Sequence, residues 1–412
     1  MFYGWYIVAS CCLISCYATG VVGLGFTAFV DPISKEFGWS YTQISLASSL
    51  RGLEAGLLVL VVGVLMDRWG PRPVIFCGSV LMALGIAALS RVNSLLFFYV
   101  TVVIIATGFS TMTSSMLMAA SANWFRRKSS LAMGITASGS ALAGLLIPLI
   151  TLLVERYGWR QALVFCAVGT LLIPLPLSLV LKHKPENIGL NPDGECRHEP
   201  GSEKSNDSMP EENSFSAREA LASKPFWFIS IASMILTMPI TALGTHIMPY
   251  LATVGIDRVT ASIIAGATPL VTIVGRISFG WIGDRMDKII LFTLALVLMS
   301  GGLLLLPMIS ADRKLPIAFF VCFFGIGWGG SVPMISGLLR TYFGLDRLAS
   351  IMGFSLSVMF AGSLVGAPVA GWVFDRWGWY EPVWYTMAAL VGITAIVVPF
   401  LLKAHILTNI RH

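Results

Sequence analysis

The sequence predicts an all-α membrane protein of twelve transmembrane helices, arranged as two pseudo-symmetric six-helix bundles. Three observations predict this fold. Hydrophobic residues make up 56% of the 412 residues and charged residues only 12%, which is far from the composition of a soluble domain. Charged and turn-forming residues divide the chain into twelve apolar runs, most of them long enough for the ~20 residues that a spanning helix needs. Landmarks at the ends of these runs recur after about 217–220 residues.

The first apolar run is too long for the core of a signal peptide, and it lacks a basic start and a small-residue cleavage pattern. We therefore expect it to be retained as the first helix. Several runs exceed ~20 residues, which indicates tilted or kinked helices. Pro148, Pro239, Pro269, Pro333 and Pro368 interrupt runs, and membrane helices tolerate such breaks where neighbours satisfy the backbone. The expected helices are 6–30, 42–66, 74–91, 95–121, 130–154, 161–181, 226–252, 260–283, 290–309, 316–339, 349–374 and 383–402.

Residues 183–224 differ in kind from the rest of the chain. This segment is polar and rich in Pro, Glu, Asn and Ser, so it cannot bury enough apolar area to order itself. We expect a cytoplasmic linker, 183–224, between an N-terminal bundle at 1–182 and a C-terminal bundle at 225–412.

The distribution of basic residues predicts the orientation. If the N-terminus is cytoplasmic, 17 Lys and Arg residues lie on the cytoplasmic side and 8 on the other, while Arg51 and Arg276 lie within apolar runs. Positive charge gathers on the cytoplasmic side of membrane proteins. We therefore expect a multi-pass protein of the plasma (inner) membrane with both termini cytoplasmic.

Composition and motifs also exclude several classes of protein. The net charge of +6 comes from short loops without a basic, aromatic-rich patch, so we expect no nucleic acid partner. The seven Cys form no CxxC pair or Cys/His cluster, which indicates neither a disulfide framework nor a metal site. Without a nucleophile–base set or a GxxxxGK[ST] loop, neither an enzyme nor an ATP-driven pump is expected. We expect a monomer without cofactors, whose partners are the bilayer and a small molecule.

The two halves repeat one another. The sequence at 67–70, Asp-Arg-Trp-Gly, closes the second run, and Asp-Arg at 284–285 closes the eighth. Glu-Arg-Tyr-Gly-Trp at 155–159 closes the fifth run, and Asp-Arg-Trp-Gly-Trp at 375–379 closes the eleventh. The same acid–Arg–x–Gly ending thus falls on both sides of the membrane, as an inverted three-helix repeat within each half predicts.

Arg276 lies deep in the apolar run from Ala261 to Ile282. A guanidinium keeps its charge at every accessible pH, and its insertion at the centre of a membrane helix costs roughly 2.5–3.5 kcal/mol. A water-filled cavity that holds an anion would offset this cost, and this is the functional interpretation of Arg276. The alternative is a structural role, in which Arg276 pairs with a carboxylate or its side chain reaches the lipid headgroups.

The loop Gly63-x-x-x-Asp67-Arg68-x-Gly70-x-Arg72 resembles the signature loop of the major facilitator superfamily. A carboxylate at a helix end, near cationic loop residues and the next helix start, makes contacts that form or break as two halves rock. Pro71 stands where that family often has a further basic residue, and the second copy lacks the glycine. The resemblance implies conformational roles for Asp67, Arg68, Arg72, Asp284 and Arg285.

Within that superfamily the chain resembles the monocarboxylate transporters and the oxalate/formate exchangers. The similar motifs are Gly4–Trp5, which opens the first helix, 124–128 with Gly134, and 342–344 before the eleventh run. Gly275–Arg276, with Gly280 following, resembles the helix that carries their substrate-binding arginine. The resemblance implies that Arg276 holds the substrate carboxylate, a task that suits a bidentate fork.

Two departures from these families concern substrate charge and coupling. Thr272 stands where animal monocarboxylate transporters often carry an Asp that is tied to proton coupling. Residues 355–360 carry no charge, whereas oxalate exchangers have a Lys in this helix. A second cation for a second carboxylate is therefore not evident, which favours a monoanion. Thr272 itself becomes a candidate substrate contact.

Arg51 and Glu54 form a second charged position inside the membrane. At i and i+3 they share a helix face and can pair. Three interpretations stay open: a structural pair, a gate or proton site, and a second substrate contact at Arg51. If an anionic substrate draws Arg51 away, Glu54 can take up a proton, and that competition would couple the two movements.

Further candidates lie in the helices that line the cavity in the resembled superfamily. His246, near the outer end of the seventh run, titrates in the range that suits proton coupling. Tyr17, Ser114, Ser115 and Trp328 are candidate substrate contacts. Helix packing is the alternative role for all of these residues.

The sequence therefore predicts a secondary active transporter for small organic anions that works by alternating access. It favours monocarboxylates, moved by proton symport or by anion exchange. A multidrug or lipophilic-compound exporter is the first alternative, although residues 139–144 lack the Gly-Pro-rich motif of drug/proton antiporters. A non-transporting membrane sensor is the second, although the linker is too short and too polar for a signalling domain.

Overall fold

The computed structural model describes residues 2–125, 129–182, 185, 217–283, 285–310, 314–343 and 348–409. Within them the first half of the chain crosses the bundle six times. The first crossing is broken by a π-helical turn, η1, and the fourth, fifth and sixth are each built from two helices. The elements are α1 (Tyr3–Ala18), η1 (Thr19–Leu24), α2 (Thr27–Phe37), α3 (Tyr41–Trp69), α4 (Pro71–Leu89), α5 (Leu95–Ser110), α6 (Ser114–Ala122), α7 (Ser129–Leu142), η2 (Ala143–Leu145), α8 (Leu146–Tyr157), α9 (Trp159–Leu172) and α10 (Pro174–Val180).

The second half also crosses six times, mostly with single long helices. Pro239, Pro269, Pro333 and Pro368 lie inside helices that continue past them. The elements are α11 (Ala217–Ala222), α12 (Lys224–Thr253), α13 (Arg258–Gly283), α14 (Lys288–Leu305), η5 (Leu306–Met308), α15 (Lys314–Phe343), α16 (Leu348–Trp377) and α17 (Glu381–Asn409).

The predicted twelve-helix membrane fold is confirmed. Eleven crossings among the described residues are long and apolar enough to span a membrane, and the 29-residue α3 is the twelfth. Two boundaries differ from expectation. The first crossing extends from Tyr3 to Phe37 because η1 and α2 continue it. Helix α11 lies inside the segment expected as a linker, of which residues 183, 184 and 186–216 lie outside the described part of the chain.

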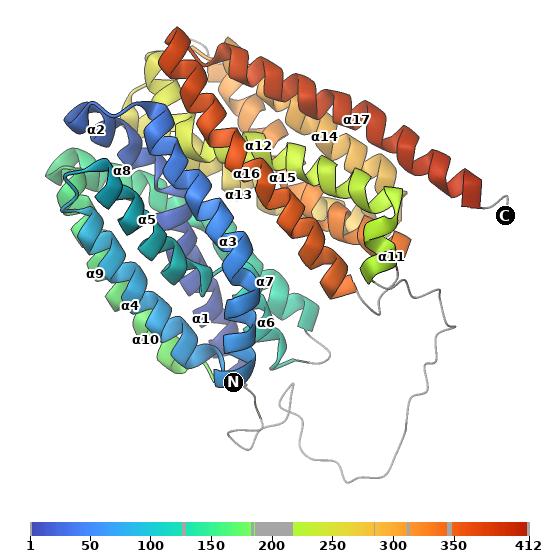
Figure 1. Cartoon of the computed structure of the whole chain (residues 1–412), viewed down its shortest axis with the longest axis horizontal. Coiled ribbons are helices and arrows are strands. Elements are labelled where there is room, and N and C mark those ends of the chain that lie inside the picture. Colours follow the sequence, from blue (N-terminus) through green and yellow to red (C-terminus); the bar gives the residue numbers. More distant parts are fainter. Residues whose placement is uncertain are drawn as a thin grey trace.

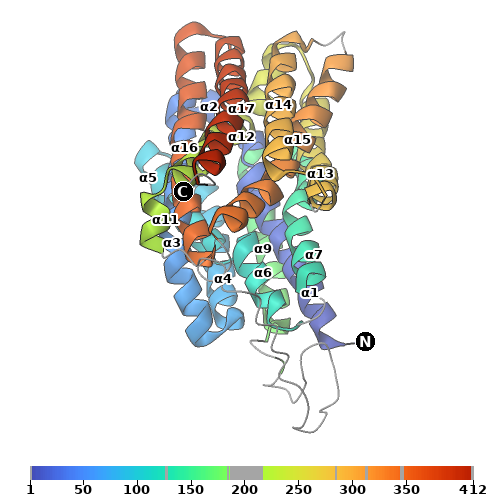
Figure 2. The same ribbon diagram turned by 90° about the vertical axis from the view of Figure 1, so that its right-hand side faces the viewer.

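The two halves lie next to each other, the first from blue to green and the second from yellow-green to red (Figure 1). Helix α3 of the first half packs along α16 of the second, and α13 packs against α7, η2 and α8. Figure 2 shows α13 and α7 on the same side of the molecule, where the halves meet. Gly144 and Gly266 permit this approach, because a Cβ on either residue would collide with the carbonyl oxygen of the other.

We name the two ends of the bundle by their loops. The linker side is the end at which α1 starts, α10 ends and α12 starts, and the far side is the opposite end. On the linker side Tyr3 donates a hydrogen bond to the Val180 carbonyl at 2.8 Å. The Gly4–Trp5 and 124–125 motifs meet here, with the Trp5 and Phe125 ring centroids 4.9 Å apart.

The repeated acid–Arg–x–Gly ending has a common backbone geometry. Gly70, Gly158 and Gly378 follow α3, α8 and α16 with φ of 81°, 81° and 77°. L-residues with a side chain rarely adopt such angles, so glycine is the residue that ends each helix without strain. The repeat in sequence is therefore a repeat of helix termination.

Candidate functional site

A cavity of about 190 Å³ lies between the two halves, and we call it the central cavity. Helices of both halves contribute to its wall. Most of the lining is apolar or aromatic, with four hydroxyl groups and one charged side chain, that of Arg51. The lining residues are Gly23, Leu24, Thr27, Ser48, Arg51, Ile147, Ile240, Thr241, Leu243, Gly244, Ile247, Ala265, Thr268, Pro269, Phe320, Phe324 and Trp328.

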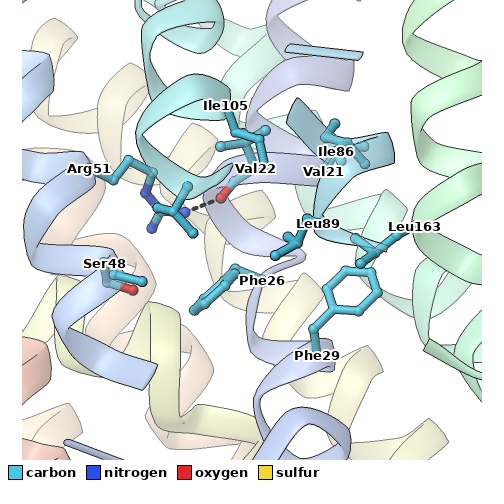
Figure 3. A pocket seen from close by; sticks show the side chains of 12 residues that line it. Val21, Val22, Phe26, Phe29, Ser48, Arg51, Ile86, Leu89, Ile105 and Leu163 are labelled. Atoms are coloured by element: carbon cyan, nitrogen blue, oxygen red, sulfur yellow. Dashed lines mark hydrogen bonds between the residues drawn. The ribbon is translucent and has the colours of Figure 1, made fainter. Parts of the chain in front are cut away.

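Arg51 projects from α3 towards η1 (Figure 3). Its Nη1 donates a hydrogen bond to the Val22 carbonyl oxygen, and its Cζ lies 5.6 Å from the centroid of the Phe26 ring. No carboxylate among the described residues lies within ion-pair distance of it. The π-helical geometry of η1, which carries Val22, is frequent at functional sites. A guanidinium has five N–H donors, so most of its capacity to bind an anion is unused.

A second, much smaller hollow of about 30 Å³ lies on the other side of Arg51, inside the first half. It has room for about one water molecule. Val21, Ile86, Leu89 and Ile105 are among the apolar side chains that line it (Figure 3). Arg51 therefore lies in the wall between an apolar hollow and the central cavity. A buried cation without a counter-charge is costly, and an anion in the central cavity would reduce that cost.

The rest of the central cavity has the character of a small-molecule site. Helix α15 contributes an aromatic wall in which the Phe320 and Phe324 centroids are 5.7 Å apart and those of Phe324 and Trp328 are 6.3 Å apart. Thr241 and Thr268 lie within α12 and α13 and donate to carbonyls of their own helices. One cation, a few hydroxyls and an aromatic wall match a ligand with one negative charge and an apolar body.

Hydrogen bonds between the halves close the far side above this cavity. His246 is fully buried there. Its Nε2 lies 2.7 Å from the Ser45 hydroxyl of α3 and 3.0 Å from the Ala367 carbonyl, and its Nδ1 lies 3.0 Å from the Tyr380 hydroxyl. Thr27 donates to the Thr245 carbonyl at 3.0 Å. His246 therefore joins the halves and does not line the central cavity.

Asp375 strengthens the same closure. Its carboxylate, at the far-side end of α16, accepts hydrogen bonds from the backbone N–H groups of Tyr41 at 2.9 Å and Thr42 at 2.8 Å. The Thr42 hydroxyl donates to it at 2.5 Å. These N–H groups open α3, where a negative charge is stabilised by the helix dipole. A carboxylate of one half thus caps a helix of the other.

Glu54 and Arg51 do not form the pair that their spacing allowed. Among the described residues Glu54 makes no ion pair. Its Oε1 contacts the Thr107 hydroxyl of α5, and its Oε2 is buried without a hydrogen bond. The two side chains leave α3 in different directions, Arg51 towards η1 and Glu54 towards α5. The interpretation as a self-neutralised pair does not describe this structure.

Arg276 lies outside the central cavity. It lines a separate groove of about 440 Å³ between α7 and α13, with Leu131, Ser138 and Ile277 among its neighbours. Its Nη1 donates to the Ala137 carbonyl of the first half at 3.2 Å, and its Nε is buried without a partner. No carboxylate in the described part of the chain pairs with it. Its role in binding substrate stays a prediction.

The remaining predicted substrate contacts lie partly in the second half and partly in the first half. Trp328 lines the central cavity, whereas Thr272 is buried and donates to the Pro269 carbonyl at 2.6 Å. The others make hydrogen bonds within the first half, and Ser115 is exposed. The Tyr17 hydroxyl donates to the Cys166 carbonyl at 2.6 Å, the Ser114 hydroxyl lies 3.1 Å from that of Ser15, and the Ser115 hydroxyl lies 3.3 Å from that of Thr113.

Of the predicted conformational residues, Arg68, Arg72 and Arg285 lie at helix ends on the linker side. Arg68 and Arg72 are exposed. Arg285 is also exposed, and its Cζ lies 4.0 Å from the ring centroid of Trp281. Asp284 and the side chain of Asp67 lie outside what the structure describes. Their conformational roles therefore stay predictions.

The fold and the cavity between its halves define a membrane transporter. A family model described as Major Facilitator Superfamily matches residues 9–359 and 247–406. The chain belongs to the Major Facilitator Superfamily, which confirms the resemblance inferred from its signature loop.

Among curated proteins, the chain is similar to monocarboxylate transporters. The chain is 25% identical to monocarboxylate transporter 12 of Rattus norvegicus, over 97% of this chain and 85% of the relative. It is 25% identical to monocarboxylate transporter 13 of Bos taurus, over 92% and 84%. It is 23% identical to monocarboxylate transporter 2 of Homo sapiens, over 96% and 84%. The predicted resemblance to monocarboxylate transporters is thus confirmed.

Solved structures share the fold at low identity. A bacterial homologue of the human lysosomal transporter Spinster, in an inward-facing and unoccupied conformation, superposes with a TM-score of 0.71 at 15% identity, over 98% of this chain and 95% of that one. The nucleoside transporter NupG superposes with a TM-score of 0.73 at 14% identity, over 98% and 100%. These likenesses concern the fold alone.

Proposed function

We propose that this transporter moves small organic monoanions, monocarboxylates foremost, by alternating access, and that Arg51 anchors the carboxylate in the central cavity. The observation that carries the proposal is that Arg51 is the one charged side chain among the residues that line this cavity, and that it lacks a carboxylate partner among the described residues. A fork of N–H donors on a buried cation favours a planar carboxylate.

The substrate charge follows from the same lining. One cation balances one carboxylate, and a second carboxylate would have to be buried against Phe320, Phe324 and Trp328. The names of the curated relatives also support a monocarboxylate. A lipophilic exporter would use the aromatic wall, but it would leave the buried cation without a function.

Arg276 is the second candidate anchor. Its unpartnered Nε and the groove around it would suit an anion that has moved towards the linker side. Because Arg51 and Arg276 line different hollows, one substrate would meet them in turn or in different conformations. Arg276 lies at the contact between α7 and α13, so its access to the substrate would depend on the relative orientation of the two halves.

Orientation and domain organisation complete the proposal. With the linker side cytoplasmic, as the bias of Lys and Arg favours, the far-side hydrogen bonds close the cavity from outside the cell. The plasma (inner) membrane is the proposed location. The proposed bundles are 1–182 and 225–412, and helix α12, which begins at Lys224, supports the second boundary.

Uptake into proteoliposomes tests this function. Purified protein should take up lactate, pyruvate or benzoate, and excess unlabelled monocarboxylate should compete. Neutral amides of the same acids and the dicarboxylate oxalate should compete poorly. Equal competition by the amides would show that the carboxylate is not recognised and would refute the proposal.

A further inference from the structure

Glu54 has an unusual environment for a carboxyl group. It lies in the membrane-spanning α3, three residues after Arg51, and faces α5. Its Oε1 contacts the Thr107 hydroxyl, while its Oε2 is buried and has no hydrogen-bond partner. Burial of an ionised carboxylate in this way is costly unless a cation or several donors compensate it.

The hydrogen atoms at this contact can be counted. A threonine hydroxyl has one hydrogen to donate and two lone pairs that accept. The Thr107 hydroxyl lies 2.9 Å from the Val103 carbonyl, which can only accept, and it also contacts Glu54 Oε1. If Glu54 is ionised, two acceptors compete for one hydrogen. If Glu54 is a neutral acid, it donates to Thr107, and Thr107 donates to Val103, so each hydrogen has an acceptor.

The elements around Glu54 bring no cation to it. Helix α5 contains no Asp, Glu, Lys, Arg or His. Helix α4 carries only Arg72, at its linker-side start. The charged residues of α16, Asp375 and Arg376, lie at its far-side end. Those of α2 are Asp31, Lys35 and Glu36, which lie in its later turns towards the far side. On α3 itself Arg51 is engaged by Val22, and Arg68 is exposed at the linker-side end of the helix. Helix α12 carries Lys224 at its linker-side start and His246 towards the far side, where its ring is bonded to Ser45, Ala367 and Tyr380. No described residue forms an ion pair with Glu54.

We propose that Glu54 is the proton-binding residue of this transporter, neutral while Arg51 is engaged by Val22 or by substrate and ionised when Arg51 turns back to pair with it. This inference rests on the proposed function, in which Arg51 anchors the anion. Residues at i and i+3 of a helix are within reach of one another, so rotation of the Arg51 side chain would suffice for the exchange of partners.

The coupled step balances in atoms and charge. A proton from water binds the Glu54 carboxylate and forms an O–H bond, which releases Arg51 to bind the substrate carboxylate. When the substrate leaves on the other side, Arg51 returns to Glu54, the O–H bond breaks, and the proton goes to water. One proton and one monoanion move together, so the cycle is electroneutral symport.

Infrared spectroscopy tests the protonation without relying on transport. Purified protein at neutral pH should show the carbonyl band of a protonated carboxylic acid, which is lost in Glu54→Gln. Thr107→Val should shift this band, because it removes the hydrogen-bond partner. The control Glu155→Gln, at an exposed carboxyl at the far-side end of α8, should leave the band unchanged. A wild-type spectrum without an acid band that depends on Glu54 would overturn the inference.

Transport measurements separate this inference from the proposed function. Glu54→Gln mimics the neutral acid, so it should retain exchange of labelled for unlabelled monocarboxylate and lose accumulation driven by a pH gradient. If Glu54→Gln still accumulates substrate against a gradient, the coupling role of Glu54 is refuted while the anion transporter stands. If the wild type exchanges no carboxylate at all, the proposed function fails, and with it the coupling role. Retained exchange also shows that the variant is folded.

Discussion

Asp375, at the end of α16 in the second half, caps α3 of the first half by accepting a hydrogen bond from the Thr42 backbone N–H at 2.8 Å. An N-terminal cap is worth about 0.5–2 kcal/mol, and because this one joins the two halves, opening of the far side would break it. Asp375→Asn should therefore weaken this closure. A loss of ~1.4 kcal/mol would raise the far-side-open population about tenfold relative to the closed one.

Cysteine accessibility measures this prediction. A Cys placed at the exposed Lys35 position on the far side would serve as a general labelling control, and a Cys at Thr241 in the central cavity should react faster with a far-side reagent in Asp375→Asn. The matched control is Asp257→Asn, because Asp257 caps α13 within its own half, through the Thr260 N–H at 2.9 Å. Equal labelling of Thr241→Cys in both backgrounds would show that Asp375 does not hold the far side closed.

Arg51→Lys should reduce monocarboxylate uptake about tenfold or more, and Arg51→Gln should reduce it further. A charge-assisted hydrogen bond contributes ~1.5–3 kcal/mol, and a lysine keeps the charge but loses the planar fork. The measurement is initial uptake at matched membrane abundance. Arg156→Lys, on the exposed far-side end of α8, serves as the control and should behave as wild type. Full uptake by Arg51→Gln would exclude Arg51 as the anchor.

Arg276→Lys should impair uptake more than it impairs folding, because a point charge replaces the fork that donates to the Ala137 carbonyl. The apparent melting temperature of the purified variant should stay close to that of the wild type. If uptake is normal at matched abundance, Arg276 is a structural contact between α7 and α13.

Trp328→Leu should change the choice among acids and leave the need for a carboxylate intact. Trp328 forms part of the aromatic wall of the central cavity, and contacts of this kind contribute ~1–3 kcal/mol to discrimination between substrates. We expect the ratio of benzoate to lactate uptake to change about tenfold. An unchanged ratio, with normal total uptake, would show that Trp328 does not contact the body of the substrate.

Gly70→Ala should lower the stability of the protein by ~1–3 kcal/mol, because its φ of 81° and ψ of 167° suit glycine alone. Gly63→Ala, in the same helix, meets no atom within 4 Å of the new Cβ and has an ordinary φ, so it should be neutral or slightly stabilising. Thermal unfolding in detergent compares the two. Equal melting temperatures would contradict the strain argument.

Several properties of this protein could be predicted from its sequence because they depend on local composition. Helix number follows from run length, since about 20 apolar residues must cross a bilayer wherever they fold. The helix ends at Gly70, Gly158 and Gly378 follow from the conformational freedom of glycine. The family follows from short motifs. The break of the first run at η1, which contains no proline, carries no comparable signal in the sequence.

The residues that line the central cavity could not be identified from the sequence, because that depends on how segments far apart in the chain pack together. Phe320, Phe324, Thr241 and Thr268 line the central cavity, but a hydroxyl or a phenylalanine in an apolar run looks the same whether it faces a cavity, a neighbour or lipid. The sequence predicted Arg276 as the main anchor and Arg51 as a second contact. Tertiary structure directs Arg51 into the central cavity and Arg276 into a groove between α7 and α13.

The sequence by itself therefore determined that the chain crosses a membrane twelve times and carries two cations and one carboxyl group deep within those crossings. Tertiary structure decided which cation meets the central cavity and that Glu54 faces Thr107 and not Arg51. The physical reason is that insertion of a helix depends on its own composition, whereas the partner of a side chain depends on the rotation of its helix against neighbours far away in the chain.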